Sequence, residues 1–487
     1  MFAKLFIFLT SVTICLAACA PTIPTTIPPS TEISPALSKT ATQTAAPEQT
    51  PTRQITRTPR PTATLVPLQL QKIEPLPQNC SDMVQGLPGD KLTEVSYLPS
   101  GYCFHGELDM FETDGHVYLA QVLSSDDPRS APAFRIVDVT NVEQPIMLGA
   151  WGWNVSTYTS DVKAFRQGDR WFLAVSRDPY QAEGSSMESL CSLIGGVAII
   201  EVTEPSEPRL INLLTGASTG SRANKKWCNS HTAEVSRDAD GNGVYLYVSA
   251  IDIFDLRVLD IGDLTNVTEA GRYTHPDAGF YNERNLFFVH DTTIVGDRVY
   301  VSYWKSGLII LNRQDLESGK RVIPLNPLDS IAPWGLNIHH AYPTTDENFV
   351  FVQDEFPFKT PESRLRLYDI RNLESPKEVA AITLPDSLGA PHNLLVSGDL
   401  LFVGWYQDGV RVFKYDTSNP DNPIVEPYAF KAVRSEQTLN PTTQTLDGIW
   451  GVRLHDCVVE GEPKTCVYAS DMSWGLIILA MEPLDPE

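Results

Sequence analysis

The sequence predicts an all-β fold, a seven-bladed β-propeller of four-stranded blades that follows a disordered linker and is closed by an N-terminal strand. Three observations predict it. A short apolar run that ends in an acidic or polar residue occurs seven times, at spacings of some tens of residues, which is typical of a repeat architecture. An alternating stretch follows most of these runs after a loop that often contains Pro. No long amphipathic helical pattern interrupts the repeats.

The repeated apolar run is the expected third strand of each blade. Its seven copies are FRIVDVT from Phe134, VAIIEVT from Val197, LRVLDIG from Leu256, GLIILNR from Gly307, LRLYDIR from Leu365, VRVFKYD from Val410 and GLIILAM from Gly475. Each unit is expected to contain a first strand such as HNLLVSG and an aromatic, β-branched second strand such as DRVYVSYW. The fourth strand is the alternating stretch, as in PKEVAAIT. Four-stranded units repeated in a ring form a propeller.

The last unit supplies only three strands before MEPLDPE. Residues 91–98, KLTEVSYL, have the alternation of the missing fourth strand, and we expect them to complete the last blade. Closure of this kind leaves no bare sheet edge. The alternative is an open β-solenoid, which the irregular spacing and the longer inserts disfavour.

The first residues resemble a bacterial lipoprotein signal. Lys4 precedes an apolar run that is too short to span a bilayer comfortably, so residues 1–18 are interpreted as a signal peptide. The run ends in Leu-Ala-Ala-Cys, which resembles the lipobox, and this implies that Cys19 becomes the lipidated first residue of the mature protein. The alternative is an ordinary signal followed by a chance cysteine. We expect an exported protein, anchored by lipid at the cell envelope or cell surface.

The segment between the signal and the repeats has a different composition. Residues 19–67 are rich in Pro and Thr and contain few large apolar side chains, so they predict a disordered tether that holds the folded part away from the membrane. Residues 68–90 are a lead-in segment, and residues 91–487 form the propeller. The formal net charge of −23, with no visible basic patch, excludes nucleic acid as a partner.

Six cysteines remain after Cys15 leaves with the signal and Cys19 takes the lipid, and an even number in an exported protein indicates disulfides. Cys457 and Cys466 flank VVEGEPKT, an expected hairpin turn, and are the firmest pair. Proximity in sequence suggests two further pairs, Cys80–Cys103 and Cys191–Cys228. A cysteine metal site is disfavoured because no CxxC motif occurs.

The runs FRIVDVT, LRVLDIG and LRLYDIR, with NVEQP and NLESP after them, resemble the LVIVD-repeat proteins of bacterial and archaeal cell surfaces. The resemblance covers nearly all of residues 91–487. It implies the propeller fold and an exported setting, but no activity.

Histidines occur in register in four consecutive units. His290, His340 and His392 each stand six residues before a turn residue, and His231 begins the equivalent strand of the preceding unit. The first strand of each blade lines the central channel, so these four imidazoles are expected near the axis at one end. Trp450 occupies this place in the last unit, Asp161 or Val162 in the second, and His105 or Asp109 in the first.

Imidazoles that converge from separate strands can bind one transition-metal ion, such as Cu, Zn or Fe. Two alternatives remain: structural hydrogen bonds copied by repeat duplication, and metal-free acid–base catalysis. Further candidate ligand-binding residues are those beside the histidines or after second strands, where the chain turns at the same face: Asp291, Trp334, His339, Asp354, Glu355, Trp405, Asp408, Trp450 and Asp471. Tyr303, Trp304 and Tyr406 also follow second strands.

These observations favour an envelope lipoprotein whose propeller is a binding module, with a protein, peptide or glycan ligand at the His-rich channel mouth. The alternative is a metal-dependent oxidase or hydrolase with a transition metal in the same place, and a third possibility is a structural scaffold. Motifs of serine hydrolases, P-loop proteins, zincins and dinucleotide-binding proteins do not occur in the sequence.

Overall fold

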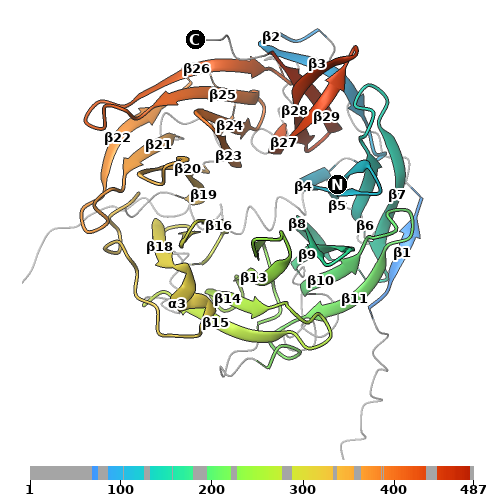
Figure 1. Ribbon diagram of the computed structural model, residues 1–487, viewed down its shortest axis with the longest axis horizontal. Helices are drawn as coiled ribbons and strands as arrows, with labels where there is room; N and C mark the ends of the chain where they lie inside the picture. Colours follow the sequence, from blue (N-terminus) through green and yellow to red (C-terminus); the bar gives the residue numbers. More distant parts are fainter. Residues whose placement is uncertain are drawn as a thin grey trace, which may run out of the picture.

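The computed structural model contains seven small antiparallel sheets arranged in a ring around a central axis (Figure 1). It describes residues 68–74, 86–102, 104–124, 132–155, 157–178, 195–220, 227–276, 288–332, 337–355, 364–384, 387, 389–434 and 447–482. The protein is therefore an all-β, seven-bladed propeller, as its repeats predict.

The first three blades run from the innermost to the outermost strand in chain order. Blade 1 consists of β4 (Phe104–Thr113), β5 (His116–Ser124), β6 (Pro132–Asp138) and β7 (Ile146–Trp153). Blade 2 consists of β8 (Tyr158–Gln167), β9 (Arg170–Asp178), β10 (Gly196–Glu201) and β11 (Arg209–Leu214). Blade 3 consists of β12 (Ala233–Arg237), β13 (Gly243–Ala250), β14 (Asp255–Asp260) and β15 (Thr268–Thr274).

The next three blades follow the same order. Blade 4 consists of β16 (Asp291–Val295), β17 (Arg298–Ser302) and β18 (Leu308–Asn312). Blade 5 consists of β19 (Ile338–Pro343), β20 (Phe349–Asp354), β21 (Leu365–Asp369) and β22 (Lys377–Ile382). Blade 6 consists of β23 (Leu394–Ser397), β24 (Leu400–Trp405), β25 (Gly409–Asp416) and β26 (Ile424–Lys431).

Blade 7 closes the ring as the sequence predicts. It consists of β27 (Ile449–Val459), β28 (Glu462–Asp471), β29 (Gly475–Met481) and the N-terminal β3 (Leu92–Leu98). The pairing of β29 with β3 is antiparallel, from Leu476 opposite Leu98 to Met481 opposite Leu92. The first and last segments of the propeller therefore share one sheet.

All seven repeated runs form the third strand of a blade, which confirms the assignment of strand order. These strands are apolar along nearly their whole length because neighbouring blades cover both of their faces. In β10, for example, all six residues are buried. The core consists of apolar clusters between adjacent sheets, such as the one that Phe172 and Ile199 of blade 2 form with Leu246 of blade 3.

The blades differ from the expected four strands in three places. The lead-in segment adds outer strands β1 (Leu70–Ile73) to blade 1 and β2 (Gly89–Asp90) to blade 6. Blade 4 has three strands in the described residues, followed by the short helix α3 (Arg313–Glu317). This helix packs tightly on β15, because a Cβ on Gly271 would lie 1.8 Å from the backbone oxygen of Leu316.

The disulfide between Cys457 and Cys466 is present in the β27–β28 hairpin, as expected. Cys228 is also disulfide-bonded. Its expected partner Cys191, and the expected pair Cys80–Cys103, lie outside the described residues, as do the signal, Cys19 and the tether. Within the described ranges, no helix has the length and apolar character needed to cross a bilayer.

Candidate functional site

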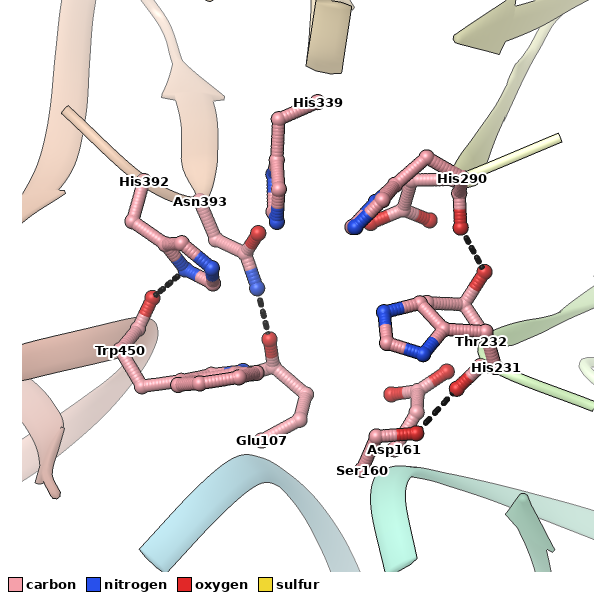
Figure 2. A pocket seen from close by; sticks show the side chains of 11 residues that line it. Glu107, Ser160, Asp161, His231, Thr232, His290, His339, His392, Asn393 and Trp450 are labelled. Atoms are coloured by element: carbon pink, nitrogen blue, oxygen red, sulfur yellow. Dashed lines mark hydrogen bonds between the residues drawn. The ribbon is translucent and has the colours of Figure 1, made fainter. Parts of the chain in front are cut away.

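A small cavity lies at one end of the central channel, where the seven innermost strands begin (Figure 2). Every blade contributes at least one side chain to it. The lining residues are Glu107, Ser160, Asp161, His231, Thr232, His290, Asp291, His339, His392, Asn393 and Trp450. The enclosed space is about 10 Å³, roughly the room that one buried water needs. The cavity therefore suits a single ion better than a glycan.

Four imidazoles from blades 3 to 6 form one cluster in this cavity. The ring centroids of His231 and His290 are 4.6 Å apart, those of His290 and His339 are 4.0 Å apart, and those of His339 and His392 are 4.0 Å apart. Figure 2 shows the rings of His290, His339 and His392 directed toward the same space. The expected convergence of channel histidines is therefore present, with one change of residue.

The expectation that His340 belongs to this cluster is wrong, and His339 takes its place. The pairing of β19 with β20 shifts register between Ile338, which lies opposite Asp354, and His340, which lies opposite Gln353. This bulge leaves His339 as the extra residue and directs it into the channel mouth, because successive side chains of a strand point to opposite faces. Trp450 is the extra residue of a similar register shift in β27.

His340 instead links two neighbouring blades. Its Nδ1 accepts a hydrogen bond from the backbone N–H of Leu394 at 3.0 Å, so the proton lies on Nε2, which is 3.1 Å from Oγ1 of Thr293. Thr293 donates in turn to the backbone oxygen of Ala341 at 2.7 Å. Burial lowers the pKa of His340 to about 3. Both ring nitrogens are engaged, so His340 has no free lone pair for a metal.

Glu355 directly follows β20 and lies beside the histidine cluster. Its Oε2 lies 3.9 Å from Nε2 of His339, and its Oε1 lies 4.0 Å from Nε2 of His392. Tyr406 donates a hydrogen bond to Oε1 at 2.5 Å. Burial raises the pKa of Glu355 to about 6. Ligand atoms of His290, His339 and Glu355 all lie within 4.8 Å of one another, an arrangement that can hold a metal ion.

Three imidazole nitrogens of the cluster are buried and make no hydrogen bond in the described structure. They are Nδ1 of His290, Nδ1 of His339 and Nε2 of His392. The tautomer of His392 follows from its other nitrogen, Nδ1, which lies 2.6 Å from the backbone oxygen of Trp450 (Figure 2). A carbonyl oxygen only accepts, so Nδ1 carries the proton and Nε2 keeps its lone pair toward the cluster.

The electrostatics keep these imidazoles neutral. Burial, with neighbouring imidazoles as a second cause, lowers the pKa of His290 and His339 well below the usual value. Burial also lowers the pKa of His392 to about 3. A neutral imidazole is the form that binds a metal.

His231 differs from the other three. Its Nδ1 lies 3.5 Å from Oδ2 of Asp178. Burial disfavours its charged form, but Asp178, Asp291 and Glu355 outweigh that cost and raise its pKa. His231 is thus held through Nδ1 by a carboxylate beside the cluster.

Three acidic side chains line the cavity beside the histidines. Glu107 accepts a hydrogen bond from Asn393 and lies 3.3 Å from Nη1 of Arg453. Asp161 pairs with Lys163 at 2.7 Å. Asp291 accepts from the backbone N–H of Thr292, and burial raises its pKa to about 8.

The other expected ligand-binding residues divide into two groups. Asp291, His339, Glu355 and Trp450 surround the cavity or the histidine cluster. The remaining described residues have structural partners: Asp354 accepts from the N–H of Asn337, Trp405 donates to Ser387, Asp408 accepts from Ser387, and Asp471 pairs with Arg434. Trp334 lies outside the described residues.

Sequence reasoning missed Glu107, Ser160, Thr232 and Asn393 as lining residues. Asn393 and Thr232 directly follow His392 and His231, so adjacency was an available signal. Glu107 lies midway between His105 and Asp109, the two residues considered for blade 1. His105 itself contacts Ser100 and the backbone oxygen of Met472, and it does not line the cavity.

No family model matches the chain, and no curated protein matches its sequence. A solved protein from Lactobacillus plantarum is 14% identical with a TM-score of 0.46, over 78% of this chain and 95% of that chain. The periplasmic gluconolactonase of Pseudomonas aeruginosa is 13% identical with a TM-score of 0.46, over 69% of this chain and 86% of that chain. These values are too low for either likeness to bear on the site.

Proposed function

We propose that this protein is a metal-dependent enzyme of the cell envelope. Its active site is the channel mouth, where His290, His339 and Glu355 hold one transition-metal ion and His392 faces it. The observation that carries the proposal is that ligand atoms of His290, His339 and Glu355 all lie within 4.8 Å of one another. A buried nitrogen of His290 and one of His339 make no hydrogen bond there, and an unmade hydrogen bond costs about 1–3 kcal/mol. A bound metal would give these two imidazoles a partner.

The donor set favours a catalytic over a structural ion. Two imidazoles and one carboxylate, as in His290, His339 and Glu355, are typical of zinc hydrolases and of non-haem iron oxygenases, where further coordination positions remain for water or substrate. Structural zinc sites are usually closed by four protein ligands, most of them cysteine. Zinc, iron and copper are therefore the metals to test.

The outer contacts support the same conclusion. His392, which faces the proposed ion, donates its Nδ1–H to the Trp450 carbonyl, and this contact directs Nε2 toward the cluster. The carboxyls of Glu107, Asp161 and Asp291 also line the cavity. Glu107 pairs with Arg453 and Asp161 with Lys163, and burial raises the pKa of Asp291 to about 8. The lining therefore carries little net charge, and an uncharged substrate suits the channel mouth.

The N-terminal sequence supports the proposed location. The apolar run followed by Cys19 and the Pro- and Thr-rich stretch suit a lipid anchor and a tether. The propeller would then act outside the cytoplasm, at a distance from the membrane that the tether sets.

Metal analysis tests the proposal. The mature chain is freed of metal, incubated separately with Zn²⁺, Fe²⁺ and Cu²⁺, desalted and analysed by plasma mass spectrometry. We expect about one equivalent of at least one metal and none in the double variant His290→Ala/Glu355→Gln. The control His455→Ala removes an imidazole that pairs with Glu112 outside the cavity, and it should keep the metal. A wild type that retains no metal contradicts the proposal and favours a metal-free binding module.

A further inference from the structure

Two large aromatic residues beside the histidine cluster have a left-handed backbone. The φ angle of Trp304 is 43° and that of Tyr406 is 28°. Residues other than glycine rarely adopt this region, and they do so at a cost of about 1–3 kcal/mol where the surroundings enforce it. Trp304 and Tyr406 occupy related places, just after the second strands β17 and β24.

This strain does not occur at the same place in every blade. In the described residues of blade 7, Met472 follows the second strand β28 without a left-handed backbone. At the end of these turns the left-handed residue is Gly307, Gly409 or Gly475, and in blade 3 it is Phe254, with a φ angle of 62°. The strained aromatics therefore call for a local explanation.

Trp304 packs on a proposed ligand. Its ring is nearly parallel to that of His290, with an interplanar angle of 17° and centroids 4.9 Å apart. Its backbone oxygen accepts a hydrogen bond from the N–H of Ile338 at 3.1 Å. Ile338 is the residue before His339, so Trp304 contacts one ligand and fixes the strand start that carries the next.

Tyr406, in blade 6, also contacts the cluster with its ring and holds the next blade with its backbone oxygen. Its hydroxyl donates to Oε1 of Glu355 at 2.5 Å, and its ring centroid lies 4.8 Å from that of His392. Its backbone oxygen accepts from the N–H of Ile449 at 2.9 Å. Ile449 precedes Trp450, whose carbonyl orients His392.

We propose that Tyr406 and Trp304 are positioning residues of the metal site, an inference that rests on the proposed function. Tyr406 holds one oxygen of Glu355 so that the other faces His339, and Trp304 fixes the plane of the His290 imidazole. The left-handed backbones allow each residue to aim its ring at the cluster while its carbonyl holds the next blade. Partners of this kind typically change metal affinity 10- to 100-fold.

Cobalt binding provides the test, because the visible absorption of Co²⁺ reports the geometry of its ligands. Tyr406→Phe removes only the hydroxyl and keeps the ring and the backbone. Tyr415→Phe is the matched control, because its buried hydroxyl donates to the backbone oxygen of Gly398 at 2.7 Å at the opposite end of blade 6. Trp304→Leu removes the stacked ring, and Trp304→Phe replaces it if the leucine variant does not fold.

The expected result is a 10- to 100-fold weaker affinity of Tyr406→Phe for Co²⁺, with a shifted visible spectrum, and a changed spectrum for the Trp304 variant. Tyr415→Phe should keep the affinity and the spectrum of the wild type. If wild type binds Co²⁺ and Tyr406→Phe binds it within twofold and with the same spectrum, the positioning role is overturned and the metal site stands. If wild type binds no Co²⁺, both proposals fall.

Discussion

Separate replacement of the adjacent residues His339 and His340 distinguishes a metal ligand from a structural histidine. His339 faces the cavity with an unpartnered Nδ1, whereas His340 makes hydrogen bonds through both ring nitrogens. His339→Ala should abolish metal binding and leave the fold nearly unchanged. His340→Ala should keep the metal and lower the stability of the protein.

The size of the stability change follows from the contacts. His340→Ala removes two hydrogen bonds worth about 1 kcal/mol each and leaves the buried N–H of Leu394 without its partner, at a further cost of about 1–3 kcal/mol. The free energy of unfolding should therefore fall by roughly 3–5 kcal/mol. His339→Ala breaks no side-chain hydrogen bond within the described structure and costs only the cavity that its buried ring leaves, so the metal-free variant should lose less stability than His340→Ala.

Urea denaturation in the presence of a chelator measures the free energy of unfolding of each variant. Zinc titration of the folded variants measures their affinity for the metal. His339→Ala should bind zinc at least about 100-fold more weakly, beyond the range typical of outer-shell partners. The reasoning is refuted if His340→Ala loses zinc while His339→Ala keeps it, or if both variants unfold alike.

Three further predictions concern the fold and its charges. Removal of residues 1–98, which include β3, should abolish the cooperative unfolding transition seen by circular dichroism. Removal of residues 1–85, which leaves β3 in place, should keep that transition. Equal behaviour of the two truncated proteins would argue against ring closure by β3. Asp291→Asn should raise the stability of the metal-free protein near pH 8 and much less near pH 4. The buried Asp291 carboxyl has its pKa raised to about 8, so the folded state keeps a proton that the unfolded chain loses above about pH 4. Urea denaturation at both pH values checks this, and an equal effect at both would contradict it. Replacement of Cys457 and Cys466 by serine should lower the free energy of unfolding by about 2–3 kcal/mol, given their separation of nine residues; an unchanged denaturation midpoint would show that the hairpin is held without the bond.

The fold could be predicted from the sequence because its signal is repeated. Each third strand is buried on both faces, so the apolar run survives in all seven blades even where loops differ in length. The β3 strand showed the alternation of a fourth strand, and the chain lacked one at its other end. The extra outer strands β1 and β2 gave no such signal, because they are short and largely exposed at the sheet edge.

The channel mouth and three of its four histidines, His231, His290 and His392, could be predicted, but the fourth could not. His340 fits the spacing of the other histidines, and only the bulge in β19 shows that His339 is the one that faces the cavity. Asp354 and Glu355 were equally plausible, and the end of β20 decides between them: Asp354 is held by Asn337, whereas Glu355 reaches the imidazoles. A bulge adds one residue to a strand and so changes which of two adjacent side chains faces the cavity. The spacing of apolar residues in the sequence does not show where such an extra residue lies.

The central claim is that one metal ion binds between blades 4 and 5 at the channel mouth. Anomalous diffraction from a crystal of the zinc-loaded protein, collected at the zinc absorption edge, tests it most directly. We expect a single strong peak at about 2.0–2.2 Å from a nitrogen of His290, a nitrogen of His339 and an oxygen of Glu355. A peak elsewhere, or none at this cluster in a fully loaded crystal, would contradict it.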